Sequence, residues 1–209
     1  MALEEDPIQW CHAAKRQAHT ISKRGKNWYV YTGSAAITIN ANNLCVITAH
    51  KINPKVRYMG EADYGCLPEQ LYYAIYVPED GSQPPREVVN APEIFIYIED
   101  FGASPADTGV VAEQNGQIIG AAWTRIIQGY GHIDNETPEL AISVLPGFRG
   151  LGIGTKMMAM LFGVLKKKGY LRTSLSVHKD NLAVAFYERL GYETVKERDD
   201  DLLMVKRLV

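Results

Sequence analysis

The feature that most constrains this chain is a glycine-rich turn between a strand pattern and a helix pattern. The turn, Arg149-Gly150-Leu151-Gly152-Ile153-Gly154, follows an alternating apolar run over Glu139–Leu145 and precedes a long apolar-faced helical pattern over Thr155–Lys168. Glycines at every second position leave the backbone N–H groups unobstructed, and a helix N-terminus adds unpaired donors and partial positive charge. Arg149 adds a full positive charge. The stretch therefore predicts a site for a phosphate or pyrophosphate group.

Two common phosphate-loop patterns do not fit this turn. A Walker A loop ends in Gly-Lys-Ser/Thr, whereas the order here is Gly154-Thr155-Lys156. A dinucleotide fingerprint has the spacing G-x-G-x-x-G and an acidic residue about 20 positions later. The glycines here are evenly spaced and residues 170–174 contain no acid. The pattern that fits is Arg-x-x-Gly-x-Gly after a strand.

A second motif follows the helix. An alternating run over Leu171–Val177 predicts a strand, and the run DNLAVAFYERLGY occupies residues 180–192. In this order, the two motifs resemble the pyrophosphate loop and the following helix of the GNAT superfamily of N-acetyltransferases, and the resemblance covers about residues 55–209. One departure is that Asn181 and Tyr187 are six positions apart where many relatives have seven. It leaves open whether Asp180 or Asn181 meets the cofactor.

The resemblance implies an α/β (α+β) acyltransferase fold with a central mixed, mostly antiparallel sheet that is split at a β-bulge and flanked by helices. In the family the strand at Glu139–Leu145 and the strand at Leu171–Val177 splay apart, and the gap admits the pantetheine arm of acetyl-CoA. Pro146 fits this expectation, because proline has no N–H and ends the pairing of a strand. Period-two alternation places Glu139, Ala141 and Ser143 on one face of the sheet.

The family further implies acetyl-CoA as co-substrate. The loop would hold its pyrophosphate, the exposed backbone before Pro146 would bind the arm, and the N–H of Val144 would polarise the thioester oxygen. The positions that match the family's cofactor contacts are Ile142, Ser143, Val144, Arg149, Gly150, Leu151, Gly152, Ile153, Gly154, Thr155, Asn181, Ala183 and Tyr187.

The activity implied is transfer of an acetyl group to a primary amine of an unidentified acceptor, by direct attack. Tyr187 is the expected proton donor, because a phenol with a pKa of about 10 lies near a thiol with a pKa of about 8.5. Glu139 is the candidate base and Glu136 the alternative, although many relatives use neither position. No cysteine lies in the motifs, so no covalent enzyme intermediate is expected.

Two other functions are compatible with the sequence. The first is a non-catalytic acyl-CoA-binding or regulatory module, in which Tyr187 is dispensable. The second is an interaction protein in which residues 1–52 carry the function and the loop is vestigial. The intact loop and the retained tyrosine favour the enzyme.

Residues 1–52 form a separate piece in this interpretation, with a boundary at Asn53-Pro54. A helix is expected over Pro7–Lys23, followed by short β-runs, which together make a small accessory segment of a helix and a β-hairpin. The runs NWYV, ITINA and VITAHK resemble the C-terminal part of a small bacterial family with no assigned function. Whether this piece is an accessory or dimerising module, or a remnant that packs on residues 55–209, is left open.

Composition excludes several other classes. The 209 residues are 46% hydrophobic with a net charge of −2, which argues against general binding to nucleic acid or membrane surfaces. There is no apolar run of about 18 residues, and the acidic N-terminus lacks the features of a secretory signal, so a cytoplasmic protein is expected. The three cysteines and five histidines show no ligand spacing, so no metal is expected. Oligomeric state stays open, with a homodimer as one option.

Overall fold

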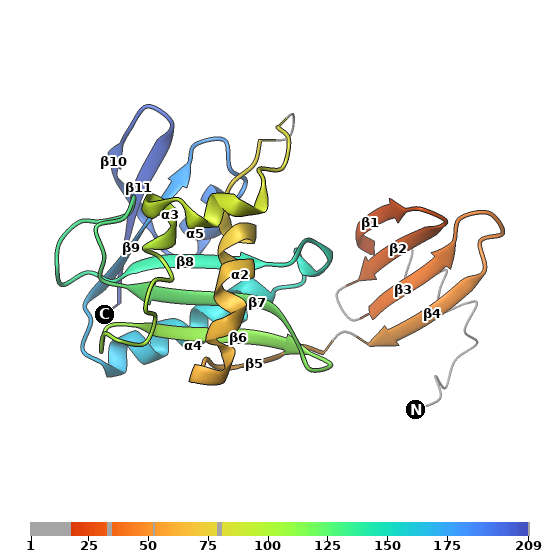
Figure 1. The fold of residues 1–209 in the computed structure, drawn as a ribbon, viewed down its shortest axis with the longest axis horizontal. Coiled ribbons are helices and arrows are strands. Elements are labelled where there is room, and N and C mark those ends of the chain that lie inside the picture. The colour runs from red at the N-terminus through yellow and green to blue at the C-terminus, as the bar shows by residue number, and fades with distance from the viewer. Residues whose placement is uncertain (1–17, 33–34, 52, 79–80, 209) are drawn as a thin grey trace.

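The computed structural model describes residues 18–32, 35–51, 53–78 and 81–208. They form a four-stranded sheet in the order β1-β2-β3-β4 and a seven-stranded sheet in the order β10-β11-β9-β8-β7-β6-β5, which lie side by side in Figure 1. The strands are β1 (Ala18–Arg24), β2 (Asn27–Thr32), β3 (Ala35–Asn40), β4 (Val46–Lys51), β5 (Lys55–Tyr58), β6 (Thr108–Gln114), β7 (Gln117–Arg125), β8 (Glu139–Val144), β9 (Arg172–His178), β10 (Glu193–Glu197) and β11 (Asp201–Arg207).

Helices cover both faces of the seven-stranded sheet. In Figure 1, α2 crosses in front of the strands and α4 lies behind them. Among the described residues no helix has both the length and the apolar character needed to cross a membrane. The α-helices are α2 (Leu67–Ala74), α3 (Pro92–Phe95), α4 (Ile153–Lys167) and α5 (Ala183–Arg189), and the 3-10 helices are η1 (Glu61–Cys66), η2 (Arg86–Asn90) and η3 (Pro146–Phe148).

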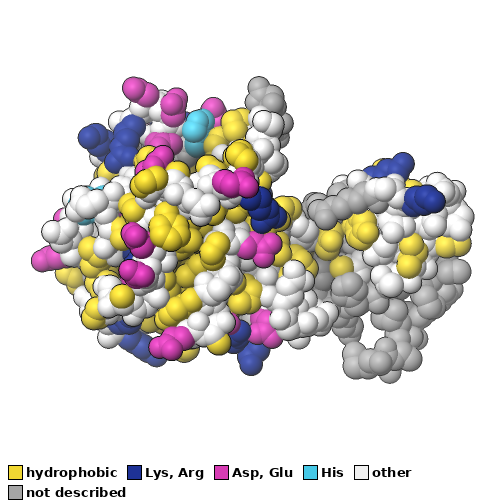
Figure 2. All heavy atoms as spheres, in the orientation of Figure 1, with side chains coloured by type: hydrophobic (Ala, Val, Ile, Leu, Met, Phe, Trp, Pro, Cys, Tyr) yellow, Lys and Arg dark blue, Asp and Glu magenta, His cyan; other side chains and the backbone are white. Residues whose placement is uncertain are grey.

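Two cores lie on the two faces, as the alternation of the strands predicts. On the α4 face the buried stripe of that helix packs against Ala122 of β7 and Leu140 of β8. On the α2 and α3 face, Leu71 packs with Ala121 and Trp123 of β7. Figure 2 shows hydrophobic side chains gathered over the middle of this second face. The α4 stripe consists of Ile153, Met157, Met158, Leu161 and Leu165.

The split sheet expected from the sequence is confirmed. All neighbouring strands pair antiparallel except β8 and β9, which are parallel and meet only where Glu139 faces Ser174. The β-bulge expected at the split is absent from the pairing of β8 with β7, which runs without a shift from Glu139 to Val144. Because β8 keeps its whole ladder with β7, the gap arises from the departure of β9 alone.

The N-terminal segment differs from its expectation. Residues 1–17, which include most of the expected helix over Pro7–Lys23, lie outside the described residues. The remainder of that helix is wrong, because Ala18–Arg24 is strand β1, in which Ile21 pairs with Val30 of β2. A ladder with β2 outweighs the helical spacing of this short stretch, and its β-branched residues suit a strand. The β-runs expected further on are strands β2, β3 and β4, so the segment is a four-stranded sheet.

Candidate active site

The backbone of β8 faces the gap at alternate residues. Leu145 N donates to Ile119 O of β7 at 2.9 Å. In an antiparallel ladder every second residue bonds to the same neighbour, so Ser143 also bonds to β7. The N–H and C=O groups of Ile142 and Val144 therefore point away from β7, toward the side where β9 has departed. This edge is open to an extended ligand, and the binding of a cofactor by Ile142 and Val144 stays a prediction.

Ser143 takes a different role from the one expected. Its hydroxyl donates to Oε1 of Gln70 at 2.7 Å, and both side chains are buried. Gln70 belongs to α2, so the contact ties that helix to β8 on the face opposite α4. Since the backbone of Ser143 bonds to β7, the residue supports the strand and presents no group to the gap.

The glycine turn leads from β8 through η3 into α4. Gly150 and Gly152 have φ values of 75° and 73°, a left-handed backbone that favours glycine. Gly152 is the N-cap of α4, and no side chain caps this helix end. A Cβ added to Gly152 would have no atom within 4 Å, so the turn opens onto free space. The first N–H groups of α4 lack partners within the helix, and no side chain caps them.

The side chains of the turn divide into anchors and exposed groups. Ile153 is buried and Leu151 is half-buried against the core on the α4 face, so each offers only its backbone to a ligand. Thr155 is exposed on the first turn of α4. Gly154 packs against α5, because a Cβ at that position would lie 3.3 Å from the ring of Phe186.

Arg149 does not lie over the glycine turn. Its Nε donates to Val144 O at 2.8 Å, and its Nη2 donates to Tyr73 O of α2 at 3.3 Å. The guanidinium therefore crosses the end of β8 and occupies one of the carbonyl groups that face the gap. Its place in the sequence gave no indication of this contact.

Tyr187 lies on the α4 face of the sheet. Its ring packs on the core of that face and makes an edge contact with Tyr192, with 5.7 Å between ring centroids. Burial raises the pKa of the Tyr187 phenol above its usual range, so the hydroxyl stays protonated at neutral pH. Asn181 caps the start of α5, because its Oδ1 accepts from Ala183 N at 2.9 Å. The side-chain oxygen of Asn181 is thereby used within the chain, and Asp180 is exposed.

Glu139 lies on the opposite face and is only 2% exposed. Its Oε1 accepts from the hydroxyl of Tyr97 and from Gly131 N, the latter at 2.6 Å. Its Oε2 is buried without a partner. Burial raises the pKa of the Glu139 carboxyl, and the two hydrogen bonds partly offset this. Glu136, the alternative base, is exposed in the preceding turn, where its N–H donates to Asp134 Oδ1 at 2.9 Å.

Several neighbours of the gap were not identified from the sequence. Tyr97 and Gln70 contact the site from the helical segments, and no spacing rule connects them with β8. The Tyr76 ring, which follows α2, stacks on His178 at the end of β9 with 4.7 Å between centroids. This stack links the α2 side of the gap to β9. In the part of the chain that the structure describes, no group of three potential metal ligands is present.

The arrangement places two protonic groups on opposite faces of the seven-stranded sheet. The phenol of Tyr187 packs on the α4 face, and the carboxyl of Glu139 lies on the other face, where β8 and β9 still pair. The open backbone edge of Ile142 and Val144 follows Glu139 along β8. Such a site suits a long ligand with a phosphate at one end and a reactive group at the gap, attacked by a second molecule from the other face.

Comparison with known proteins agrees with this geometry. A sequence model of the acetyltransferase (GNAT) family matches residues 71–192, and one described as a protein of unknown function (DUF3781) matches residues 2–50. An acetyltransferase of Pectobacterium atrosepticum is 37% identical over 105 residues, which are 49% of this chain and 67% of that protein. An acetyltransferase of Yersinia pestis is 33% identical over 102 residues, 48% of this chain and 64% of that protein. The chain thus spans about two thirds of the length of these relatives.

Solved structures share the fold at low identity. The PaiA N-acetyltransferase of Thermoplasma acidophilum in complex with coenzyme A has a TM-score of 0.57 at 20% identity, covering 75% of this chain and 99% of that chain. YncA of Salmonella typhimurium, a putative acetyltransferase with its cofactor acetyl-CoA, has a TM-score of 0.53 at 19% identity. The match covers 76% of this chain and 95% of that chain. The likeness covers about three quarters of the chain.

Proposed function

Because the chain belongs to the acetyltransferase (GNAT) family, whose sequence model matches residues 71–192 of 209, we propose that it transfers an acetyl group from acetyl-CoA to a primary amine. The observation that carries the proposal is the open backbone edge of β8 beside the uncapped N-terminus of α4. The edge offers an extended binding surface, and the helix end offers N–H donors for a phosphate.

In this proposal the backbone of Gly150–Gly154 and the exposed Thr155 hold the pyrophosphate. Ile142 and Val144 bind the pantetheine arm through their N–H and C=O groups, as an added strand would. Arg149 leaves Val144 O to the arm and turns its charge toward the phosphates. Ile153 and Leu151 anchor the turn in the core, so the donors keep their direction while the ligand binds.

Tyr187 is the proposed proton donor. The amine nitrogen forms its bond to the acetyl carbon, the carbon–sulfur bond breaks, and the departing thiolate takes the phenolic proton. Val144 N–H donates to the thioester oxygen, where negative charge builds up. Glu139 is the proposed acceptor of the proton that the amine loses. Glu136 is not proposed, because it is exposed in a turn and engaged only through its backbone.

The two sheets are consistent with two domains in the chain. They share no strand, and separate family models match on either side of residue 53. We therefore propose an acetyltransferase domain over residues 55–209 and an accessory domain over residues 1–52.

The deciding experiment is calorimetric titration of the full chain with acetyl-CoA. Wild type is expected to bind and Gly152→Glu is expected to lose binding, because a carboxylate would then face the bound phosphates. Gly163→Glu is the matched control, since it adds the same charge to an exposed position of α4 with no atom within 4 Å. Gly152→Ala introduces the same backbone strain at this left-handed position but adds no charge. Comparing its affinity for acetyl-CoA with that of Gly152→Glu therefore separates the effect of strain from the effect of charge.

The result also decides between the functions. Failure of wild type to bind acetyl-CoA would overturn the proposal and transfer attention to residues 1–52. Binding without release of free thiol from any of a panel of amines and N-terminal peptides would leave an acyl-CoA-binding module. Binding with thiol release identifies the class of acceptor.

A further inference from the structure

The carboxyl of Glu139 is enclosed by a short segment, Gly129-Tyr130-Gly131, called the strap below. Gly131 N donates to Oε1 of Glu139 at 2.6 Å. A Cβ added to Gly129 would lie 2.6 Å from Oε2 of Glu139 and 2.6 Å from the hydroxyl oxygen of Tyr97. Real Cβ atoms do not approach other atoms so closely, so the strap touches the carboxyl with no space between them. Any molecule that reaches Oε2 from this side must displace the strap.

The hydroxyl of Tyr97 joins the strap to the carboxyl. It donates to Oε1 of Glu139 and accepts from Tyr130 N, the latter at 2.9 Å. One oxygen atom thus bonds to both partners. Movement of the strap away from Tyr97 leaves that hydroxyl to the carboxyl alone.

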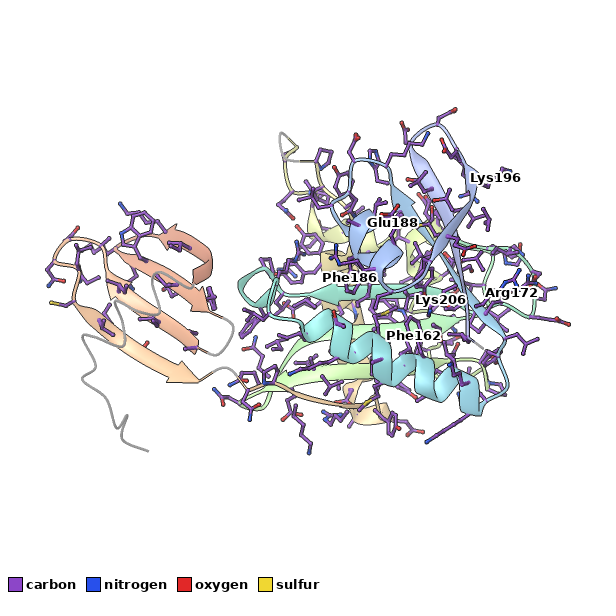
Figure 3. All side chains as sticks on the ribbon, turned by 180° about the vertical axis from the view of Figure 1, so that it is seen from behind. Phe162, Arg172, Phe186, Glu188, Lys196 and Lys206 are labelled. Atoms are coloured by element: carbon purple, nitrogen blue, oxygen red, sulfur yellow. The ribbon has the colours of Figure 1, made fainter. Side chains whose placement is uncertain are left out.

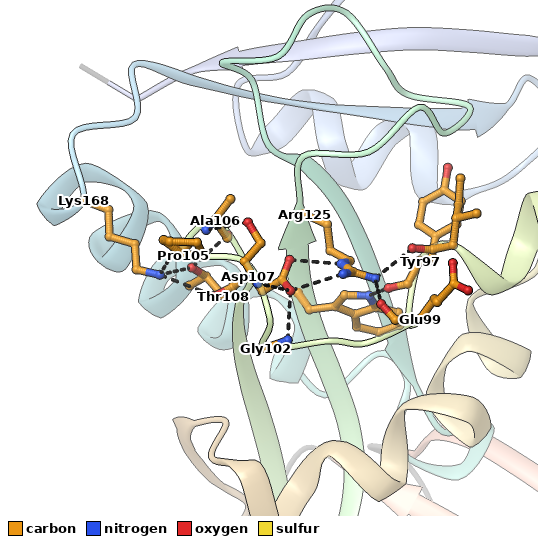
Figure 4. A network of polar contacts seen from close by, with 12 residues as sticks. Tyr97, Glu99, Gly102, Pro105, Ala106, Asp107, Thr108, Arg125 and Lys168 are labelled. Atoms are coloured by element: carbon orange, nitrogen blue, oxygen red, sulfur yellow. Dashed lines mark hydrogen bonds and ion pairs between the residues drawn. The ribbon is translucent and has the colours of Figure 1, made fainter.

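Tyr97 itself belongs to a rigid frame, part of which Figure 4 shows. Its carbonyl accepts from Nε1 of Trp123 at 2.9 Å. The guanidinium of Arg125 donates to Ile96 O at 2.9 Å and forms a 3.0 Å ion pair with Asp107. Trp123 is fully buried and Arg125 nearly so, so the backbone of Tyr97 is held in place. Lifting the strap would break its bond to the Tyr97 hydroxyl and leave this frame intact.

The unpartnered Oε2 of Glu139 indicates which kind of group could bind beneath the strap. Oε2 is buried without a hydrogen bond, which leaves the desolvation cost of that atom uncompensated. A bound ammonium or amine N–H would supply the missing donor. The acceptor of the proposed reaction carries such a group, and the strap blocks its path.

We propose that Tyr97 is a positioning residue that couples the strap to Glu139, so that the carboxyl meets the acceptor amine only when the strap lifts. The inference rests on the proposed amine acetylation. It assigns the acid–base readiness of Glu139 to the contacts of one hydroxyl, which donates to the carboxyl and accepts from the strap.

The charges around Glu139 are compatible with such a coupling. His132, directly after the strap, and Arg198, in the β10–β11 hairpin, both lower the pKa of the Glu139 carboxyl through their charge. Arg198 donates to Tyr130 O at 2.6 Å, so it holds the strap from its outer side. Arg125 faces Glu139 in the β7–β8 register, but its guanidinium is turned to Asp107 and is not a partner of the carboxyl.

Amide hydrogen exchange of the full chain without ligand tests the coupling directly. In Tyr97→Phe the amide of Tyr130 loses its hydrogen-bond acceptor, while the amide of Gly131 keeps its hydrogen bond to the carboxyl of Glu139. Coupling predicts that both amides exchange faster, by roughly tenfold, the factor that corresponds to one lost hydrogen bond. Tyr72→Phe is the matched control, because its hydroxyl bonds to Pro84 O at 2.9 Å, away from the strap. Acceleration at Tyr130 alone, with Gly131 unchanged, overturns the proposal.

The pH profile of kcat/KM for the acceptor gives the second readout. The Tyr97 hydrogen bond lowers the pKa of Glu139, so Tyr97→Phe is expected to move the acid limb of the profile to higher pH. A purely structural role would lower the rate or the stability without moving the limb, and that result also overturns the proposal. Failure of wild type to bind acetyl-CoA defeats the proposed function, whereas the exchange result still decides whether Tyr97 couples strap and carboxyl.

Discussion

At the scale of single residues, burial acts in the same direction on the two proposed catalytic groups and has opposite consequences for them. It raises the pKa of Tyr187 and of Glu139. A phenol with a raised pKa is protonated at neutral pH and stays available as a donor. A carboxyl with a raised pKa is a better base once deprotonated, but a smaller fraction of it is deprotonated. Burial therefore keeps Tyr187 in the protonated form that a proton donor needs, whereas it disfavours the deprotonated form that Glu139 needs to act as a base.

The first prediction concerns Tyr187→Phe. Loss of the proton donor is expected to lower kcat by about 100-fold, near the lower end of what general acid catalysis contributes. The dissociation constant of acetyl-CoA is expected to stay the same, because the ring and its packing remain. Steady-state kinetics and calorimetry measure the two quantities. An unchanged kcat would remove Tyr187 from the mechanism.

The second prediction concerns the stability of Glu139→Gln as a function of pH. The folded-state pKa of Glu139 is raised, so its contribution to wild-type stability is fully present below the unfolded pKa of about 4.3. That contribution is lost as the pH rises through the folded value. The glutamine variant has no such loss. The melting temperature of the variant minus that of wild type is therefore expected to increase with pH. Thermal melts from pH 4 to pH 8 test this, and a constant difference would contradict it.

At the scale of elements, the glycine turn and α4 act as one unit. The two left-handed glycines let the chain leave β8 and enter α4 with its N–H groups exposed, and the buried stripe of α4 fixes the direction of that helix end. Beside α4 lies a hollow of about 340 Å³. In the described part of the chain, Arg189, Lys206 and Arg207 have no ion pair with a carboxylate. The hollow is lined by Thr155, Ala159, Phe162, Lys166, Arg189, Leu190, Lys206 and Arg207.

This hollow leads to the third prediction. The ammonium of Lys206 lies 5.3 Å from the ring centroid of Phe162. Both residues line the hollow, and Figure 3 labels them close to each other. Lys206→Glu is expected to weaken acetyl-CoA binding by about tenfold at low salt, and by less at high salt, because ions screen the effect. Lys196→Glu on β10 makes the same change of charge away from the hollow. Equal losses in both variants would show a general charge effect.

At the scale of the whole molecule, the N-terminal sheet contacts η3 just before the glycine turn. The ring of Tyr31, on β2, lies 6.0 Å from the ring of Phe148. A Cβ on Gly147 would lie 2.9 Å from the Tyr31 hydroxyl oxygen. The accessory sheet therefore touches η3, the segment that connects β8 to the proposed phosphate site.

The fourth prediction follows from this contact. Tyr31→Ala removes the support of η3 and is expected to raise the dissociation constant of acetyl-CoA by about threefold, the effect of losing a fraction of a kcal/mol. Tyr58→Ala, at a largely exposed position of β5, is the control. Calorimetry on the two variants measures the effect. An affinity equal to that of wild type would leave the N-terminal sheet without influence on the site.

The sequence by itself determined the family, the split sheet and the positions of the glycine turn and of Tyr187. Each of these depends on local order along the chain: glycine spacing, strand alternation, and a helix pattern that follows directly. Contacts between distant segments were decided only by the tertiary structure. Arg149 turned back onto Val144 O, Ser143 was taken by Gln70, and Glu139 was enclosed by Tyr97 and the strap. Ser143 and Gln70 are 73 positions apart and Glu139 and Tyr97 are 42 apart, whereas Arg149 reaches Val144 over five positions. In each case packing brings the groups together, and no spacing in the sequence records the contact.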